Sequence, residues 1–536
     1  MIKERKSGSK KFLSGFILVC LVAVLAPLAV AADQGDMDTS FGTDGVVVVD
    51  WIDGGTENQS EMAVDGSGRL VAVFFGTPAG GPSPSYVVRY LSDGSLDTTF
   101  GTNGITAPIE DFSFNDVKLD SSGRILATGH YYGEGGSFGV VRFTADGVID
   151  TSFGTDGSVT TEFPPAEHSD MAWSLVLDAS EKIILSGACG TEGPYVLCLA
   201  RYTPDGTLDA SFGTNGYVST DLGGLGHDSV IDGSGNLLVT TSTTGGTLAV
   251  ARFTPDGTLD NTFGTNGVAE TDVPGSSGAN STVPFDVVVD GSNNVIVGGF
   301  CFSNDLDGVT RSCIARFTSD GVLDTSFGTN GVITNQPYST ANNLVIDDSD
   351  RLLHAGSSCG PTPANSYENM CVSRYTADGE LDTTFGADGF AIYDSGYKYN
   401  LPLDAVFDGL GNVILTSKCM EENQNSFDTC LVKFKNASTP GVPTDVIVIA
   451  GSSQVTVVWN APNDDGDNAI TEYTATASPG GATCTTATTS CTIIGLTNGT
   501  PYTVTVFATN GQGNSEISPA YGPATPGAGD QPGYSG

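Results

Sequence analysis

The side chains best suited to acid–base chemistry near neutral pH are four histidines, at His130, His168, His227 and His354. None lies in a His-Glu-x-x-His zinc motif, and the Asp box of sialidases is absent from the sequence. His354 lies in the apolar segment RLLHAG, which favours a buried strand residue over a general base. The sequence therefore predicts no catalytic residue and no metal ligand.

Carboxylates leave two further chemistries open. The paired acids of glycoside hydrolases stand roughly 5 to 9.5 Å apart, a separation that a sequence does not give. Calcium prefers several oxygen ligands from one loop, and acids cluster at Asp305, Asp307 and Asp464–Asp467. Neither cluster continues to the glutamate that completes an EF-hand. Solvated turns are the favoured interpretation, so no cofactor is predicted and calcium is the alternative.

Ten cysteines form close pairs along the chain. The pairs are Cys189 with Cys198, Cys301 with Cys313, Cys359 with Cys371, Cys419 with Cys430, and Cys484 with Cys491. In the first four pairs, the second cysteine lies three residues before the Arg or Lys of a strand-like segment, and the first ends the preceding segment. This spacing places the thiols opposite each other across a hairpin, which suits a disulfide. Since no Cys-x-x-Cys site is present, five disulfides formed in an oxidising compartment are predicted.

One phrase, of which LDTSFGTNG is a typical copy, occurs seven times. Its phenylalanines recur at intervals of 51 to 64 residues, near the roughly 40–50 residues of known propeller blades. They are Phe41, Phe100, Phe153, Phe212, Phe263, Phe327 and Phe385. Because this residue recurs in every unit, we expect it to be a buried anchor between neighbouring units.

Each unit is predicted to hold four short strands. In the first unit these are Val46–Asp50, Met62–Asp65, Leu70–Phe75 and Tyr86–Tyr90, bounded by Asp-Gly turns that accept a positive φ. No segment after the N-terminal region sustains a helical period of apolar residues. A four-stranded unit cannot bury both faces alone, so the units must stack, and seven units favour a closed ring. The predicted fold class is all-β, with a seven-bladed β-propeller, and the recurrent arginines are expected to pair with the Asp of the Leu-Asp step.

The repeated phrase followed by an Asp-Gly-Ser-Gly hairpin resembles the bacterial delta-60 repeat, a propeller-like module. The resemblance covers residues 37–435, and all seven copies carry the Asp, Phe and Gly positions. Only the last copy departs from the pattern, with Lys433 in place of the arginine. The resemblance implies a secreted or surface protein and assigns no activity.

The N-terminal residues 1–31 have the pattern of a signal peptide. Five basic residues precede an apolar run that starts at Phe12, and a small-residue site follows at Ala29–Ala31. The alternative is an uncleaved anchor, because the apolar run is long. The favoured interpretation is a protein secreted or held at the bacterial cell surface, with no membrane insertion after cleavage.

The repeat phrase stops after residue 435, and Asn436–Pro443 is predicted to be a linker. Residues 441–526 alternate as strands and resemble a fibronectin type III domain, followed by a Pro/Gly-rich tail at 527–536. The resemblance implies a β-sandwich, with a tyrosine corner at Tyr502. The landmarks that carry it, and its expected core, are Trp459, Tyr473, Leu496 and Tyr502.

The formal net charge of −41 disfavours nucleic acid and anionic membranes as partners. We expect a non-catalytic binding or scaffold protein for an unidentified extracellular protein or glycan, with Val273–Val283 and Ser303–Thr310 as candidate recognition loops. One alternative is a polysaccharide hydrolase or lyase, for which Asn304–Val309 and Tyr393–Asn400 are the candidate loops. The other is a structural surface-layer or matrix component.

Overall fold

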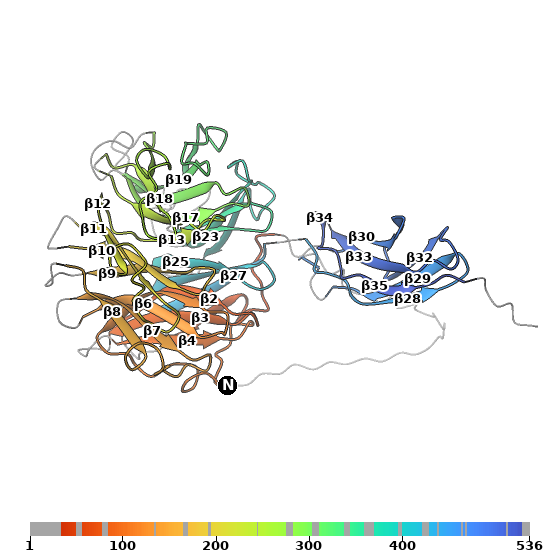
Figure 1. Ribbon diagram of the computed structural model, residues 1–536, viewed down its shortest axis with the longest axis horizontal. Coiled ribbons are helices and arrows are strands. Elements are labelled where there is room, and N and C mark those ends of the chain that lie inside the picture. Colours follow the sequence, from red (N-terminus) through yellow and green to blue (C-terminus); the bar gives the residue numbers. More distant parts are fainter. Residues whose placement is uncertain are drawn as a thin grey trace, which may run out of the picture. The chain divides into compact units, whose positions relative to one another are not determined.

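The computed structural model describes most of the chain after the predicted signal peptide. The described residues are 34–49, 56–77, 84–132, 136–164, 170–190, 195–243, 245–274, 282–302, 310–336, 343–357, 369–394, 399–420, 428–436, 439–462, 465–466, 469–510 and 513–527. Every regular element within these ranges is a β-strand (Figure 1). No helix in this part of the chain is long and apolar enough to span a membrane.

The repeat region forms seven antiparallel sheets, which we number 1 to 7 along the chain. In order of pairing they are β2–β3–β4 (Thr56–Val64, Leu70–Thr77, Ser85–Tyr90), β5–β6–β7–β8 (Phe112–Leu119, Ile125–Tyr131, Ser137–Phe143, Ser158–Thr161), β9–β10–β11–β12 (Met171–Leu177, Ile183–Cys189, Val196–Tyr202, Tyr217–Gly223), β13–β14–β15–β16 (Ser229–Ile231, Leu237–Thr241, Leu248–Phe253, Val268–Thr271), β17–β18–β19–β20 (Thr282–Val289, Val295–Phe302, Thr310–Phe317, Val332–Gln336), β21–β22–β23–β24 (Asn343–Ile346, Leu352–Ser357, Asn369–Tyr375, Phe390–Asp394) and β25–β26–β27–β1 (Tyr399–Phe407, Val413–Met420, Asp428–Phe434, Val46–Val49). In sheet 1 the fourth position is taken by isolated bridges from Ile105 and Ile109.

The sheets form a closed ring. The first strand of each sheet contacts the first strand of the next, and β2 of sheet 1 contacts β25 of sheet 7. These first strands therefore surround the centre of the ring, as in a β-propeller. The all-β propeller architecture expected from the repeats is confirmed.

The boundaries predicted for the units are wrong by one strand. Val46–Asp50 was expected to open the first unit, but β1 pairs with β27, with Val46 opposite Val432. In the same way, β8 follows the phrase that contains Phe153. It is nevertheless the last strand of sheet 2, whose other strands come before that phrase. The offset closes the ring, because the N-terminal strand completes the sheet built by the C-terminal repeat.

The repeated phrase joins neighbouring sheets. In six units the arginine and the Asp of the Leu-Asp step form an ion pair of 2.8–2.9 Å, which confirms the expected pairing. The same guanidinium lies 4.4–4.6 Å from the centre of the phrase's Phe ring. It also reaches an oxygen of the next unit, as Arg142 Nη1 does by donating to Pro204 O at 2.5 Å. Lys433 replaces this group in the last unit and pairs with Asp38 at 2.9 Å.

All seven phenylalanines of the phrase are at most 1% exposed. Phe212 illustrates their packing, since a Cβ added to Gly257 of the next sheet's turn would lie 2.9 Å from its ring. Only glycine lets the two sheets approach this closely, and Gly257 also has a φ of +85°. The phenylalanine therefore fills the space between successive sheets.

Asn436 belongs to the repeat region, although it was predicted to open the linker. Its side chain is 1% exposed, and its Oδ1 accepts a hydrogen bond from Arg374 Nη1 at 2.7 Å. In the earlier units the arginine donates this hydrogen bond to a backbone carbonyl of a turn, such as Pro204 O. Asn436 Oδ1 takes the place of that carbonyl.

Four of the five predicted cysteine pairs lie at disulfide distance, with Cα–Cα separations of 5.8 to 6.1 Å. Cys371 is also disulfide-bonded, and its predicted partner Cys359 lies outside the described residues. The expected placement directly across a hairpin is wrong, because the register sets Gly187, and not Cys189, opposite Cys198. In the three described propeller pairs the bonds therefore run diagonally between the paired strands.

We expect the mature protein to contain no free thiol. Peptide mapping under non-reducing conditions, after treatment with an alkylating agent, should yield no labelled cysteine. Labelled Cys301 or Cys313 would contradict the pairing in sheet 5, because each is buried beside the other.

The C-terminal domain is a two-sheet β-sandwich. Its sheets are β28–β29–β32 (Thr444–Ala450, Gln454–Asn460, Ser490–Ile494) and β31–β30–β33–β34 (Ala482–Thr486, Glu472–Ser478, Tyr502–Asn510, Gly513–Asn514), with β35 (Tyr521–Ala524) paired to β33. Trp459, Tyr473, Leu496 and Tyr502 lie in its core. The Tyr502 hydroxyl accepts a hydrogen bond from Thr497 N at 3.1 Å, which forms a tyrosine corner.

Candidate functional site

Seven side chains at one repeated position, four residues before the Asp of each hairpin, face the centre of the ring. We call them the inner ring. They are Glu61, Asp116, Ser174, Asp228, Asp286, Asn343 and Asp404. Neighbouring members contact each other directly, as Ser174 Oγ does by donating to Asp228 Oδ1 at 3.2 Å and Asn343 Nδ2 by donating to Asp404 Oδ1 at 2.8 Å.

Five members of the inner ring accept a hydrogen bond from a backbone N–H of the next sheet. Asp404 Oδ2 accepts a hydrogen bond from Met62 N at 2.6 Å, and Asp116 Oδ2 accepts one from Leu175 N at 2.7 Å. The same contact joins Ser174 to Ser229 N, Asp228 to Val287 N and Asp286 to Leu344 N. A buried backbone N–H needs such an acceptor, so these oxygens serve the scaffold.

Five carboxyl groups share the inner ring with a single cation, Lys118, whose Nζ lies 2.6 Å from Asp116 Oδ1. Burial, followed by the charges of Asp404 and Asp116, raises the pKa of Glu61 well above its ordinary value. Burial and the Asp228 charge likewise raise the pKa of Asp286 well above its ordinary value. Burial raises the pKa of Asp404 to about 7, although the hydrogen bond from Met62 N and the Lys118 charge oppose the shift.

Lys118 keeps its charge in this setting. Burial lowers the pKa of its ammonium, but the charges of Asp116 and Glu61 outweigh burial and raise it above the ordinary value. The position two residues before the hairpin Asp carries aliphatic side chains in the other six sheets. Within the described ranges, no three His, Cys, Asp or Glu side chains are arranged to hold a metal ion.

The described histidines are neutral or engaged with the backbone. Burial lowers the pKa of His227 and of His354 to about 4, so neither is poised to exchange protons near pH 7. His227 stacks on Phe285 with ring centres 4.4 Å apart. His130 Nδ1 lies 2.7 Å from Asp170 O. His168 lies outside the described residues.

Ser137 is the central residue of a Gly-x-Ser-x-Gly pentapeptide at 135–139, a pattern shared with hydrolase nucleophiles. A nucleophile elbow needs a sharp turn from a strand into a helix. Ser137 instead begins β7, is 6% exposed and lies opposite Tyr131 of β6. Residues 137–139 of the pentapeptide therefore lie in a sheet.

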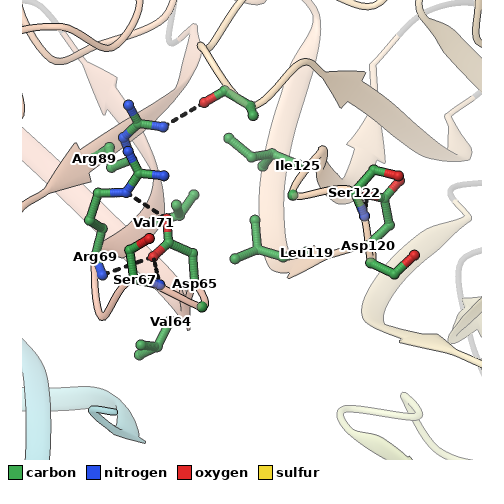
Figure 2. Close-up of a pocket in the computed structure, with 14 residues that line it drawn as sticks. Val64, Asp65, Ser67, Arg69, Val71, Arg89, Leu119, Asp120, Ser122 and Ile125 are labelled. Carbon is green, nitrogen blue, oxygen red and sulfur yellow. Dashed lines mark hydrogen bonds and ion pairs between the residues drawn. The ribbon is translucent and has the colours of Figure 1, made fainter.

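A cavity of about 560 Å³ lies between sheets 1 and 2 (Figure 2). We call it the hairpin cavity, because its two walls are the turns Asp65–Arg69 and Asp120–Arg124, which follow β2 and β5. Leu119 and Ile125 point from sheet 2 toward the side chains of sheet 1. The cavity combines this apolar wall with polar turn residues, a composition typical of ligand sites.

The carboxylates of the hairpin cavity are engaged by their own turns. Asp65 accepts from Ser67 N at 2.8 Å, from Arg69 N at 3.0 Å and from Arg69 Nε at 2.6 Å. Burial raises the pKa of Asp65, but these hydrogen bonds outweigh it and hold the pKa below its ordinary value. Arg89 is also occupied, by Asp97 and by Ala145 O. Arg69 keeps about a third of its side chain exposed, whereas Arg89 is buried, and Arg69 Nη1 lies 3.8 Å from Asp97 Oδ2.

The loops favoured by the sequence fall mainly outside the described residues. This applies to most of Val273–Val283 and of Ser303–Thr310, to the whole of the candidate enzyme loop Asn304–Val309, and to the middle of Tyr393–Asn400. It also applies to the candidate calcium residues Asp305, Asp307, Asp464 and Asp467. These predictions remain predictions.

The inner ring and the hairpin cavity were both missed from the sequence. The signal for the inner ring is an acid, amide or hydroxyl residue four positions before every hairpin Asp. It is visible only when the seven units are aligned on that Asp and not on the Phe-Gly phrase. For the cavity the signal is a glycine at a turn position where three of the seven units carry a longer side chain.

Comparison with protein families gives two matches. Residues 67–100, 121–153, 181–212, 233–263 and 292–327 match a β-propeller domain of unknown function, DUF5122, and residues 441–521 match the fibronectin type III domain. A comparison with curated proteins gives no match. The family matches agree with both architectures expected from the repeated phrase and the C-terminal landmarks.

Several solved structures share parts of the fold. Titin kinase with its flanking domains is 27% identical over 17% of this chain and 18% of that chain, with a TM-score of 0.16. The extracellular domain of a hybrid two-component system from B. thetaiotaomicron is 12% identical over 89% of this chain and 56% of that one, with a TM-score of 0.36. The polysaccharide lyase Uly1 is 10% identical over 70% and 89%, with a TM-score of 0.42. These scores are too low to support an argument about function.

Proposed function

Because the chain carries DUF5122 β-propeller repeats and a fibronectin type III domain, we propose that it is an extracellular, non-catalytic binding protein. The propeller serves as the rigid scaffold that holds a protein or glycan ligand. The fibronectin type III domain serves as the module that spaces or presents it. The disulfides support an extracellular site of action, since they persist in oxidising compartments.

The observation that carries this proposal is the use of the repeated ionisable side chains. The arginines and aspartates of the phrase pair with each other, and the inner-ring oxygens take backbone N–H groups of the next sheet. When an ionisable side chain recurs in every unit and is already engaged in a contact between units, a structural role is favoured over a catalytic one. Recognition then falls to features that differ between units, which is where binding residues on rigid scaffolds concentrate.

We expect the mature protein to bind a ligand and to leave it chemically unchanged. Arrays of extracellular glycans and proteins should be screened with the folded protein, using heat-unfolded protein as the control. Each ligand found should then be incubated with the protein and analysed by mass spectrometry. Cleavage of a polysaccharide, abolished by one acid-to-amide substitution, would overturn the proposal in favour of an enzyme.

A further inference from the structure

The third residue after the hairpin Asp, which we call the bridging position, faces the turn of the preceding sheet. Its occupants from sheet 1 to sheet 7 are Gly68, Gly123, Glu181, Gly235, Asn293, Asp350 and Gly411. All seven have a positive φ, between 58° and 84°. The backbone is therefore alike in every turn, and only the side chain differs.

Where the bridging position carries a side chain, its oxygen accepts a hydrogen bond from the preceding turn. Asp350 Oδ1 accepts from Gly291 N at 2.7 Å. The carboxylate of Glu181 accepts from Ser121 N at 3.2 and 3.3 Å. Asn293 Oδ1 accepts from Gly233 N at 2.8 Å. The fold thus uses the first N–H after the hairpin Asp as an anchor for a side-chain oxygen.

Between sheets 1 and 2 this oxygen is absent, because the bridging residue is Gly123, and it is absent as well at the three junctions where the bridging residue is Gly68, Gly235 or Gly411. The equivalent donor is Gly66 N, which has no acceptor among the described residues. A Cβ added to Gly123 would meet only Ala145 Cβ, at 3.9 Å. The hairpin cavity lies at this junction and is lined by both Gly66 and Gly123.

The charge at this junction resembles that of the junction filled by Glu181. Arg69 stands four residues after the hairpin Asp in sheet 1, as Arg124 does in sheet 2, where the Glu181 carboxylate arrives. A cation beside an N–H donor favours a charged acceptor over a neutral one. The open junction therefore matches a carboxylate.

We propose that the hairpin cavity binds the carboxylate of an aspartate or glutamate side chain from a protein partner. Gly66 N donates to it and Arg69 balances its charge. The proposal rests on the binding function proposed above and names its partner class. A polypeptide is favoured because Glu181 and Asp350, which fill the equivalent junctions, are themselves polypeptide side chains, and the partly exposed Leu119 offers apolar contact to methylene groups.

The net charge restricts the partner further. A chain with a formal charge of −41 repels polyanions at long range. A basic segment that carries one acidic residue avoids this repulsion and still supplies the carboxylate. Acidic polysaccharide is therefore the weaker candidate, and the test includes it as a separate probe.

The test is a titration of the full mature protein labelled with ¹⁵N-glycine, in which the Gly66 amide signal is identified by its loss in Gly66→Ala. The probes are the capped peptides acetyl-Lys-Glu-Lys-amide and acetyl-Lys-Gln-Lys-amide, and methyl glucuronide, all at constant ionic strength. We expect the Glu peptide to shift the Gly66 signal to saturation and the Gln peptide to leave it in place. The Gly291 amide, already bonded to Asp350, should not move with any probe.

Gly123→Asp should abolish the response, because it supplies the missing carboxylate from within the chain. Asp350 shows that aspartate adopts the required positive φ, of 58°, at this position. Gly235→Asp, the same change at another junction, should keep the response and serves as the matched control.

Three results would overturn the proposal. The first is equal shifts with the Glu and Gln peptides, or no shift with either peptide, which would show that the cavity does not select a carboxylate. The second is an undiminished response in Gly123→Asp, which would place the peptide elsewhere. The third is a glucuronide that saturates the signal at lower concentration than the Glu peptide, which would replace the protein partner with an acidic glycan. Ligand binding at other surfaces, and with it the proposed function, would survive any of the three.

Discussion

Phe212→Ala should lower the free energy of unfolding of the propeller by about 3–5 kcal/mol, the range for large aromatic side chains in cores. Phe212 is 1% exposed, and its ring centre lies 4.6 Å from the Arg201 guanidinium. Gly257, which lies against the ring, has no side chain that could fill the cavity left by the substitution. Denaturant unfolding at pH 7, followed by tryptophan fluorescence and by far-UV circular dichroism, measures the change.

Phe302 provides the matched control, because it ends β18 with 42% of its surface exposed. We expect Phe302→Ala to change the free energy of unfolding by about 0.5 kcal/mol or less, as surface substitutions do. A loss below about 1 kcal/mol for Phe212→Ala, small for a buried aromatic, would show that the phenylalanine of the phrase does not anchor neighbouring sheets.

The repeated phrase made much of this fold predictable. Turn residues such as Gly257 and strand ends such as Arg201 recur with fixed spacing, so both the strands and the Arg–Asp pair follow from local chemistry. The assignment of strands to sheets does not follow from it. The sequence of the repeated phrase is the same whether the strand that follows it begins a new sheet or completes the preceding one. Only the pairing of β1 with β27 decides.

The inner ring was not predictable for a related reason. Its members include Glu61, Ser174 and Asn343, so the position conserves hydrogen-bonding capacity and not residue type. Each looks like an ordinary polar residue in a strand when its unit is considered alone. The shared environment arises when the ring closes and brings side chains from non-adjacent sheets within reach of one another.

The hairpin cavity depends on a missing side chain. Gly123 looks like any turn glycine, since a positive φ alone explains it. Its second consequence appears only beside Glu181 and Asp350, which show what a side chain at that position does. The size of the opening also depends on the spacing between sheets, which sequence does not give.

The second large effect that we expect concerns pH. Burial raises the pKa of Asp404 to about 7 in the folded protein, whereas an unfolded aspartate has a pKa of about 3.9. Between these values the folded state binds more protons than the unfolded state, so the free energy of unfolding falls as pH rises through this window. The stabilisation is fully present below about pH 4 and is lost by about pH 7. Glu61 and Asp286, whose pKa values are also raised, act in the same direction.

Asp404→Asn should therefore flatten this decline, by at most about 1.4 kcal/mol per pH unit, the value for one proton. The groups that face Asp404 are Met62 N, Ala405 N and the Asn343 amide, together with the charged or titratable side chains of Lys118, Asp116, Glu61 and Asp286. The substituted asparagine keeps an oxygen for Met62 N. Denaturant unfolding from pH 4.5 to 7.5 gives the slope. Asp93→Asn is the control, because hydrogen bonds from Ser95 lower the pKa of Asp93 and its titration lies below this range. A slope in Asp404→Asn equal to that of the unsubstituted protein would mean that Asp404 stays ionised throughout, and that Lys118 and the backbone N–H groups outweigh its burial.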